Sequence, residues 1–209
     1  MDFFIYVIES PSSEDVFVDR HEGSLIYHAA KLNGIECIIR NAFSPELFEH
    51  ALKTDLPHLM KENRACPPII HISAHGNKNG IHLTNEEIIS WPHLCELLIP
   101  INKLLNGGLF LCMSSCKGFA ALRMSFSSIK TQLPFSGVIG NTGEPLWNET
   151  GIAYATFYNL LKKGEPFDTI VEAMKKASGN PNFLIAASET SECDFFKLFG
   201  FSHSDPQID

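Results

Sequence analysis

The chain has 209 residues, of which 44% are hydrophobic and 19% are charged, so it contains enough apolar material for one sizeable core. Its formal net charge of −8 argues against a protein that binds nucleic acid directly, because such proteins carry a basic face. No stretch approaches the roughly 18 uninterrupted apolar residues of a membrane-spanning helix, and we therefore expect no contact with a membrane.

The N-terminal residues and the cysteines indicate a cytoplasmic location. Residues 1–9 are apolar but short, and they lack the basic region that opens a secretory signal peptide, so we interpret them as a first strand. Six cysteines are spread through the expected strands and helices. This distribution is typical of reduced thiols in a cytoplasmic protein.

The first part of the chain alternates strands with helices. We expect strands over residues 3–9 and 35–40, and helices over residues 22–33 and from 44 to about 63. A loop signal at residues 10–13 ends the first strand, and Asn33-Gly34 ends the first helix. Ser44 and Pro45 open the second helix, and Pro57 is expected to disturb it.

The same alternation continues to residue 187. The expected strands cover residues 69–74, 108–114, 136–140 and 182–187, with a short edge strand at 80–84. The expected helices cover residues 117–130, 148–163 and 165–177, and one more runs from Thr84 toward Trp91. Thr84-Asn85-Glu86-Glu87 is a helix-capping pattern, and Gly164 separates the last two helices.

Strands that alternate with helices and read as nearly continuous apolar runs are typical of a mostly parallel sheet covered on both faces. No repeat, low-complexity tract or linker divides the chain. We therefore predict an α/β fold in a single domain over residues 1–201, followed by a polar tail at residues 202–209 that is expected to fray.

Two of the expected strands end at reactive side chains. The strand over residues 69–74 leads into His75-Gly76, and the strand over residues 108–114 leads into Ser115-Cys116. Functional groups of open α/β sheets collect at the carboxyl ends of the strands, and a cysteine beside a histidine is the arrangement of a nucleophilic dyad. If these strands are neighbours, the chain is a cysteine hydrolase.

Cys116 is preferred to the other cysteines as the nucleophile. It follows two small residues where a strand meets a helix, and a helix N-terminus or a nearby imidazolium stabilises a thiolate. Cys112 lies inside the strand, where burial would keep the thiol inert. The remaining cysteines are interpreted as small core residues: Cys37, Cys66, Cys95 and Cys193.

Three segments in order resemble a known family. Ser73-Ala74-His75-Gly76 and Ser114-Ser115-Cys116-Lys117-Gly118 are similar to the active-site motifs of caspase-like cysteine proteases, at a separation similar to the roughly 50 residues found in caspases. Residues 138–140, 153–164 and 173–177 resemble the C-terminal half of CHAT domains. The resemblance covers roughly residues 69–178 and implies a caspase-like three-layer α/β/α sandwich.

The resemblance implies a cysteine endopeptidase that cleaves a protein or peptide substrate without a cofactor. His75 and Cys116 would be the catalytic residues, and the backbone N–H groups of Gly76 and Cys116 would stabilise the oxyanion. CHAT proteins place a Trp and an acidic residue in the pocket loop, and this chain differs there in register. Glu144, Trp147 or Glu149 would then contribute to the substrate pocket, and Glu9 would contribute at the end of the first strand.

The family also implies a regulatory protein partner or an activating signal, and in bacteria a role in defence. Two alternatives stay open. One is a catalytically inactive caspase-like module that serves in protein interaction. The other is a zinc-binding hydrolase, although the histidines and cysteines lack compact ligand spacing and we expect no metal site.

Overall fold

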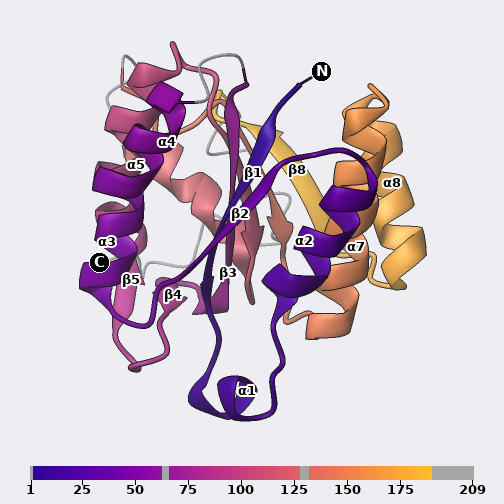
Figure 1. Cartoon of the computed structure of the whole chain (residues 1–209), viewed down its shortest axis with the longest axis horizontal. Coiled ribbons are helices and arrows are strands. Elements are labelled where there is room, and N and C mark those ends of the chain that lie inside the picture. Colours follow the sequence, from indigo (N-terminus) through magenta and orange to yellow (C-terminus); the bar gives the residue numbers. More distant parts are fainter. Residues whose placement is uncertain (1, 63–65, 128–131, 190–209) are drawn as a thin grey trace, which may run out of the picture.

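The computed structural model describes residues 2–62, 66–127 and 132–189 of the chain. Its central sheet has the strand order β2-β1-β3-β6-β7-β8, and Figure 1 shows this sheet between two groups of helices. Neighbouring strands run parallel except for β8, which is antiparallel to β7. The strands are β1 (Phe4–Ser10), β2 (Cys37–Asn41), β3 (Pro68–Asn77), β6 (Phe110–Ser114), β7 (Gly137–Asn141) and β8 (Phe183–Ala187).

Alternate residues of the strands supply two separate apolar cores. In β1, for example, Tyr6 and Ile8 belong to one cluster of buried side chains, and Ile5 and Val7 belong to the other. Side chains of successive strand residues point to opposite faces, so a strand that is apolar throughout is buried on both sides. This burial explains why the strands read as continuous apolar runs.

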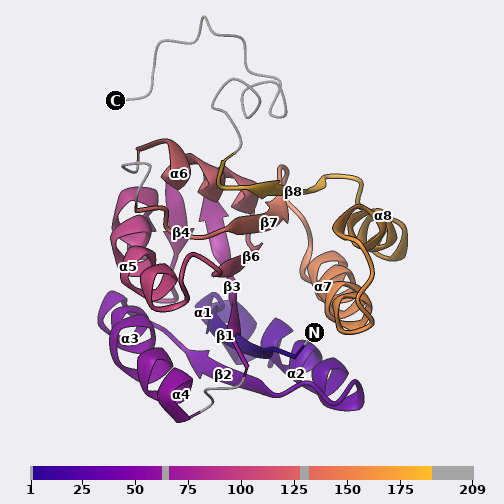
Figure 2. The ribbon, with the colours of Figure 1, turned by 90° about the horizontal axis from the view of Figure 1, so that it is seen from above.

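Each face of the sheet is covered by its own helices, as the view along the sheet in Figure 2 shows. One group consists of α2 (Glu22–Leu32), α7 (Trp147–Lys162) and α8 (Phe167–Ser178). The other consists of α3 (Pro45–His50), α4 (Leu56–Glu62) and α5 (Trp91–Leu104). The predicted α/β class with a mostly parallel sheet is therefore confirmed.

A widened helical turn joins α3 to α4. Residues Ala51–Asp55 form a π-helical turn immediately before Pro57. Proline has no N–H to donate to the carbonyl group four residues earlier, and here that carbonyl belongs to Lys53. The predicted disturbance therefore coincides with a π-helical turn, one of the local irregularities that interrupt α-helices.

Three local predictions were wrong or incomplete. No helix starts at Thr84, because β4 (Gly80–His82) and β5 (Ile88–Ser90) form an antiparallel ribbon with the end of β3; Glu86 has a positive φ of 71° in the turn between them. A short helix α1 (Ser13–Phe17) was missed in the segment interpreted as loop. The helix predicted over residues 117–130 is a 3₁₀ helix, Gly118–Arg123, followed by α6, Met124–Ser127, and the remainder lies outside the described residues.

The prediction of a single domain over residues 1–201 stays a prediction, and the tail at residues 202–209 lies outside the described part of the chain. Of the cysteines taken as core residues, Cys95 is buried and Cys37 and Cys66 are half-buried, while Cys193 also lies outside that part. Among the helices described, none combines the length and the apolar character needed to cross a bilayer.

Candidate active site

His75 lies near the end of β3, and Cys116 follows the neighbouring strand β6. β3 pairs in parallel with β6, and Ser73 lies opposite Ser114 in the register. Each of the two reactive residues comes two positions after this pair, at the carboxyl end of the strands. Both line a cavity of about 340 Å³. The structure therefore brings together the histidine and the cysteine that the sequence identified.

Asp15, on α1, holds the imidazole of His75. The Nε2–H group of His75 donates a hydrogen bond of 3.1 Å to Asp15 Oδ2, because a carboxylate can only accept. Ser12 Oγ and Trp147 Nε1 donate to the same oxygen at 2.7 and 3.3 Å. Burial alone would raise the pKa of Asp15, but these hydrogen bonds outweigh it and hold the pKa below its usual value.

This bonding leaves the other ring nitrogen of His75, Nδ1, as the proton acceptor. The indole of Trp147 lies against the imidazole edge to face, with the ring centroids 5.4 Å apart. His75 is therefore fixed in tautomer by Asp15 and in position by Trp147, while its side chain stays 45% exposed to the cavity.

The Cys116 thiol is half-buried. Burial raises its pKa, the negative charge of Glu144 raises it further, and Lys117 opposes them. The expectation that a following helix N-terminus lowers this pKa was wrong, since only the short 3₁₀ helix follows. Cys112 is fully buried, and burial raises the pKa of its thiol much further.

The turn after Cys116 has a defined geometry. Lys117 adopts a left-handed conformation with φ of 54°, which is uncommon for a residue with a side chain. Its N–H group donates a 2.7 Å hydrogen bond to the carbonyl oxygen of Gly143. The loop between β7 and α7 therefore supports the turn that presents the thiol.

Gly76 permits a close approach between the two strand ends. A Cβ atom added there would lie 2.9 Å from the Cys116 carbonyl oxygen and 3.1 Å from Cβ of Ser115. Any other residue would force the nucleophile turn away, so the glycine is required by the packing of the site itself.

Of the other residues predicted for the substrate pocket, some line the cavity and some do not. Trp147 lines the cavity. Glu144 is 72% exposed and pairs with Lys117 at 3.5 Å. Glu149 accepts hydrogen bonds from Leu146 N–H and from Asn180. Glu9 is buried, and its Oε1 atom accepts a 2.8 Å hydrogen bond from Gly23 N–H, so its carboxylate lies behind the cavity lining.

A buried polar network lies beneath the two strand ends. Ser114 Oγ donates a 2.8 Å hydrogen bond to Glu22 Oε1, and Glu22 Oε2 is 3.5 Å from Nε2 of His71. His71 Nδ1 is in turn 2.9 Å from the hydroxyl of Tyr158. Burial would raise the pKa of Glu22, but the neighbouring imidazole of His71 and the hydroxyl groups of Ser73 and Ser114 lower it. The network ties α2 and α7 to β3 and β6.

The sequence patterns did not identify Asp15 and Glu22 as residues of the site, although one signal for Asp15 was present. Ser12 and Asp15 have the spacing of a capping box, and in the structure Asp15 N–H donates to Ser12 Oγ at 3.1 Å. That signal predicts the start of α1 but not the contact with His75. Glu22 had no signal, because charged residues at the start of a helix are usually solvated.

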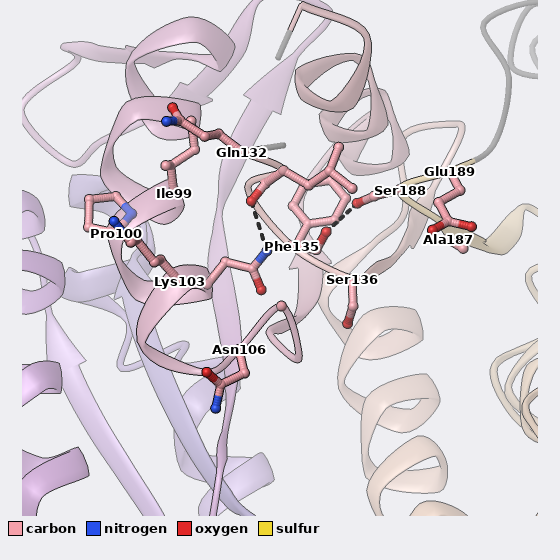
Figure 3. Close-up of a pocket in the computed structure, with 13 residues that line it drawn as sticks. Ile99, Pro100, Lys103, Asn106, Gln132, Phe135, Ser136, Ala187, Ser188 and Glu189 are labelled. Carbon is pink, nitrogen blue, oxygen red and sulfur yellow. Dashed lines mark hydrogen bonds between the residues drawn. The ribbon is translucent and has the colours of Figure 1, made fainter. Parts of the chain in front are cut away.

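A larger cavity of about 790 Å³ lies elsewhere (Figure 3). Its walls come from the segments before β6 and β7 and from the segment after β8, including Asn106, Ser136 and Ser188. This is the amino end of the parallel strands, opposite to the edge where functional groups of α/β sheets collect. We therefore assign the candidate active site to the smaller cavity, which holds the nucleophile and the histidine.

Among residues 2–62, 66–127 and 132–189, no group of three or more His, Cys, Asp or Glu side chains is placed to hold a metal ion.

Comparisons with known proteins bear on the fold. No family model matches the chain, and no curated protein sequence is similar to it. Among solved structures, the Arg-specific cysteine proteinase gingipain R (RgpB) is similar, with 12% identity and a TM-score of 0.52 over 85% of this chain and 44% of that one. The complex of Porphyromonas gingivalis RgpB pro- and mature domains is also similar, with 13% identity and a TM-score of 0.52 over 86% and 45%.

The chain therefore has the caspase-like α/β fold of these cysteine proteinases and spans less than half of their length. At such identities the likeness concerns the fold. It does not test the resemblance to CHAT domains, which stays a prediction.

Proposed function

We propose that this chain is a cysteine endopeptidase with Cys116 as nucleophile and His75 as general base. The observation that carries the proposal is the placement of both side chains at the ends of neighbouring parallel strands, in one cavity, with His75 held by Asp15. A nucleophile, a base and a group that orients the base are the elements of nucleophilic acyl transfer.

The proposed reaction uses these groups in order. Cys116 gives its proton to Nδ1 of His75, and the thiolate attacks the carbonyl carbon of the scissile bond. The N–H groups of Gly76 and Cys116 stabilise the negative oxygen of the intermediate. The C–N bond then breaks, and His75 returns its proton to the leaving amine. Water, deprotonated by His75, cleaves the thioester and releases the acid and the free thiol.

The charges of the cavity favour a basic residue before the scissile bond. Glu14 and Asp15 line the cavity together with Arg20, whose guanidinium donates a 3.0 Å hydrogen bond to Asp15 Oδ1. Arg20 is 60% exposed and so is free to leave, which would let a Lys or Arg of the substrate take its place on the carboxylate. A preference for Asp at this position would contradict the assignment.

A peptide-library cleavage profile tests the proposal. The full-length chain and its Cys116→Ala variant are incubated with the library, and the products are read by mass spectrometry. We expect cleavage after basic residues by the unmodified chain alone. Cleavage by the Cys116→Ala variant would count against Cys116 as the nucleophile. Absence of cleavage by both proteins, even with an activating partner or after cleavage of a loop, would count against the endopeptidase function.

We further propose, on the resemblance to CHAT domains, that the enzyme is cytoplasmic, controlled by a protein partner or by cleavage of one of its loops, and employed in bacterial defence. The raised pKa of Cys116 supports control, because a partner that draws Glu144 away from the thiol would favour the thiolate. Full activity of the isolated, uncleaved chain would contradict this part of the proposal.

The same raised pKa favours one alternative, an inactive caspase-like module that binds proteins. Labelling with a thiol-reactive electrophile at neutral pH distinguishes the two functions. In an enzyme, Cys116 reacts faster than the other cysteines, and His75→Ala slows it. Equal and slow labelling of Cys116 in both proteins would favour the interaction module.

A further inference from the structure

A second cavity adjoins the candidate active site. It has a volume of about 400 Å³ and shares three of its lining residues, Arg20, Leu146 and Trp147, with the catalytic cavity. The rest of its lining comes from the start of α2 and from the first turns of α7. The indole of Trp147, together with Arg20 and Leu146, therefore forms a wall that the two cavities share.

The lining of this second cavity offers apolar surface to a ligand. Leu25 is 43% exposed and Leu146 is 64% exposed, and both line it beside Trp147. Gly151 leaves additional room, since an added Cβ atom would lie 3.4 and 3.7 Å from the two δ-carbons of Leu25. These are ordinary van der Waals distances, so a Cβ atom there would contact Leu25 without a clash.

The charged residues of the lining already have partners. Arg20 bonds to Asp15 and, when a substrate cation takes its place there, can extend into solvent because it is 60% exposed. His21 Nδ1 lies 3.4 Å from Glu9 Oε2. Glu22 is fully buried within the network beneath the strand ends. A ligand in this space therefore contacts leucine side chains and an indole, which favours an aliphatic or aromatic group over an ion.

We propose that this second cavity binds an apolar side chain of the peptide substrate. The proposal rests on the proposed endopeptidase function and adds a second element of specificity to it. An extended peptide advances about 3.3 Å per residue, and the two cavities share a wall. The apolar residue is therefore within roughly two positions of the basic residue in the first cavity.

Two variants test the subsite, and neither changes a residue of the proposed reaction. Gly151→Leu fills the cavity, and Leu25→Ala removes one of its walls. We compare peptides that differ only at the residue expected to enter the second cavity. For the unmodified chain we expect kcat/KM to be about 10- to 100-fold higher when this residue is Leu or Phe than when it is Ala. Both variants should lose this preference while they cleave the Ala peptide as before.

Thr156→Leu is the matched control, because it adds a leucine to α7 at a position outside the cavity lining. It should keep the preference. If the preference survives in Gly151→Leu and Leu25→Ala, or if the unmodified chain shows none, the subsite is overturned while the endopeptidase stands.

A binding measurement separates the subsite from catalysis. Fluorescently labelled Leu and Ala peptides are titrated into the Cys116→Ala variant, with and without Gly151→Leu, and anisotropy is recorded. Tighter binding of the Leu peptide that Gly151→Leu abolishes supports the subsite even where no cleavage is found. Equal affinities of the two peptides for Cys116→Ala would overturn it.

Discussion

Asp15 uses its two carboxylate oxygens for different partners. Oδ2 accepts from His75, Ser12 and Trp147, while Oδ1 accepts from Arg20. The side chain is only 6% exposed, so water competes weakly for these oxygens. In the proposed mechanism, one residue thus orients the general base and supplies the negative charge of the first pocket.

We expect Asp15→Asn to lower kcat/KM for basic peptides by about 10²- to 10⁴-fold, because an amide no longer fixes the tautomer of His75 or attracts a cation. Peptide cleavage assays with the purified full-length variant measure the effect. Asp19→Asn, at a side chain that is 99% exposed, is the control and should leave kcat/KM unchanged. An active Asp15→Asn variant would remove Asp15 from the proposed machinery.

The charges beside Cys116 lead to a prediction on pH. Because Glu144 raises the pKa of the thiol and Lys117 lowers it, Glu144→Gln should move the pH profile of thiol alkylation toward lower pH, and Lys117→Ala should move it toward higher pH. The unmodified profile should have its midpoint above that of a free cysteine. Iodoacetamide labelling of Cys116, followed by mass spectrometry between neutral and alkaline pH, gives the three profiles; coincident profiles would contradict the prediction.

At the scale of the elements, the buried network joins four of them. Ser73 and Ser114 each lie two residues before a proposed catalytic residue, and Glu22 and Tyr158 come from helices on the same face of the sheet. A buried charge that loses its partner is strongly destabilising. The network therefore helps to hold the ends of β3 and β6 in place, and its loss would destabilise the sheet.

Replacing Glu22 by Ala should lower the free energy of unfolding by about 1–3 kcal/mol, because it leaves the hydroxyl group of Ser114 buried without its hydrogen-bond acceptor. Urea denaturation measures this change. The exposed pair of Glu172 with Lys175 is the control, and Glu172→Gln should have no measurable effect. A Glu22→Ala variant as stable as the unmodified chain would show that this hydrogen bond contributes nothing.

The network also sets the direction of an acid effect. The pKa values of Glu22 and Asp15 are lowered by folding, so the unfolded chain binds protons at these carboxylates more readily than the folded one. Their contribution to stability is complete above the usual carboxylate pKa and is lost as the pH falls through the lowered values. Thermal melting from neutral pH downward should show this loss, and it should be smaller in Asp15→Asn.

The sequence was informative about most strands with a long apolar pattern and about the C-terminal helices. The strand and helix signals from residue 137 onward agree with β7, α7, α8 and β8, and the short edge strand predicted at residues 80–84 agrees with β4. β5 and the start of α5 at Trp91 were missed, because a strand of three residues carries too little alternation and the capping pattern at Thr84 outweighed it. α1 has five residues, and its Phe17 is 90% exposed, so it shows no buried face.

At the scale of the whole molecule, the site follows from the topology. The rule that functional groups lie at the carboxyl ends of parallel strands was enough to select His75 and Cys116 from the sequence. It does not specify which strands are neighbours, and the pairing of β3 with β6 had to come from the structure. Asp15 is 60 positions from His75, and no local pattern reports a contact over that distance.

The net charge of −8 leads to a prediction on substrate attraction. Peptides with basic flanks should be cleaved with a kcat/KM that falls about tenfold between roughly 0.01 and 0.15 M salt, because the Debye length shortens from about 30 to 8 Å. Steady-state kinetics with two peptides that share the cleaved residue but have basic or acidic flanks test this. For the peptide with acidic flanks, kcat/KM should rise with salt concentration. The same salt dependence for both peptides would rule out electrostatic attraction of the substrate by the net charge.

The hydrogen bond between Asp15 and Trp147 spans 132 positions of the chain, and this span has a consequence for biosynthesis. A ribosome makes Asp15, His75 and Cys116 well before it reaches α7, and domains acquire their structure as they emerge. A growing chain that ends before Trp147 therefore carries the reactive thiol without the wall that completes its pocket. Under the proposed function, the order of synthesis would delay a competent site until most of the fold exists, and the nascent chain and its neighbours would not be cut prematurely.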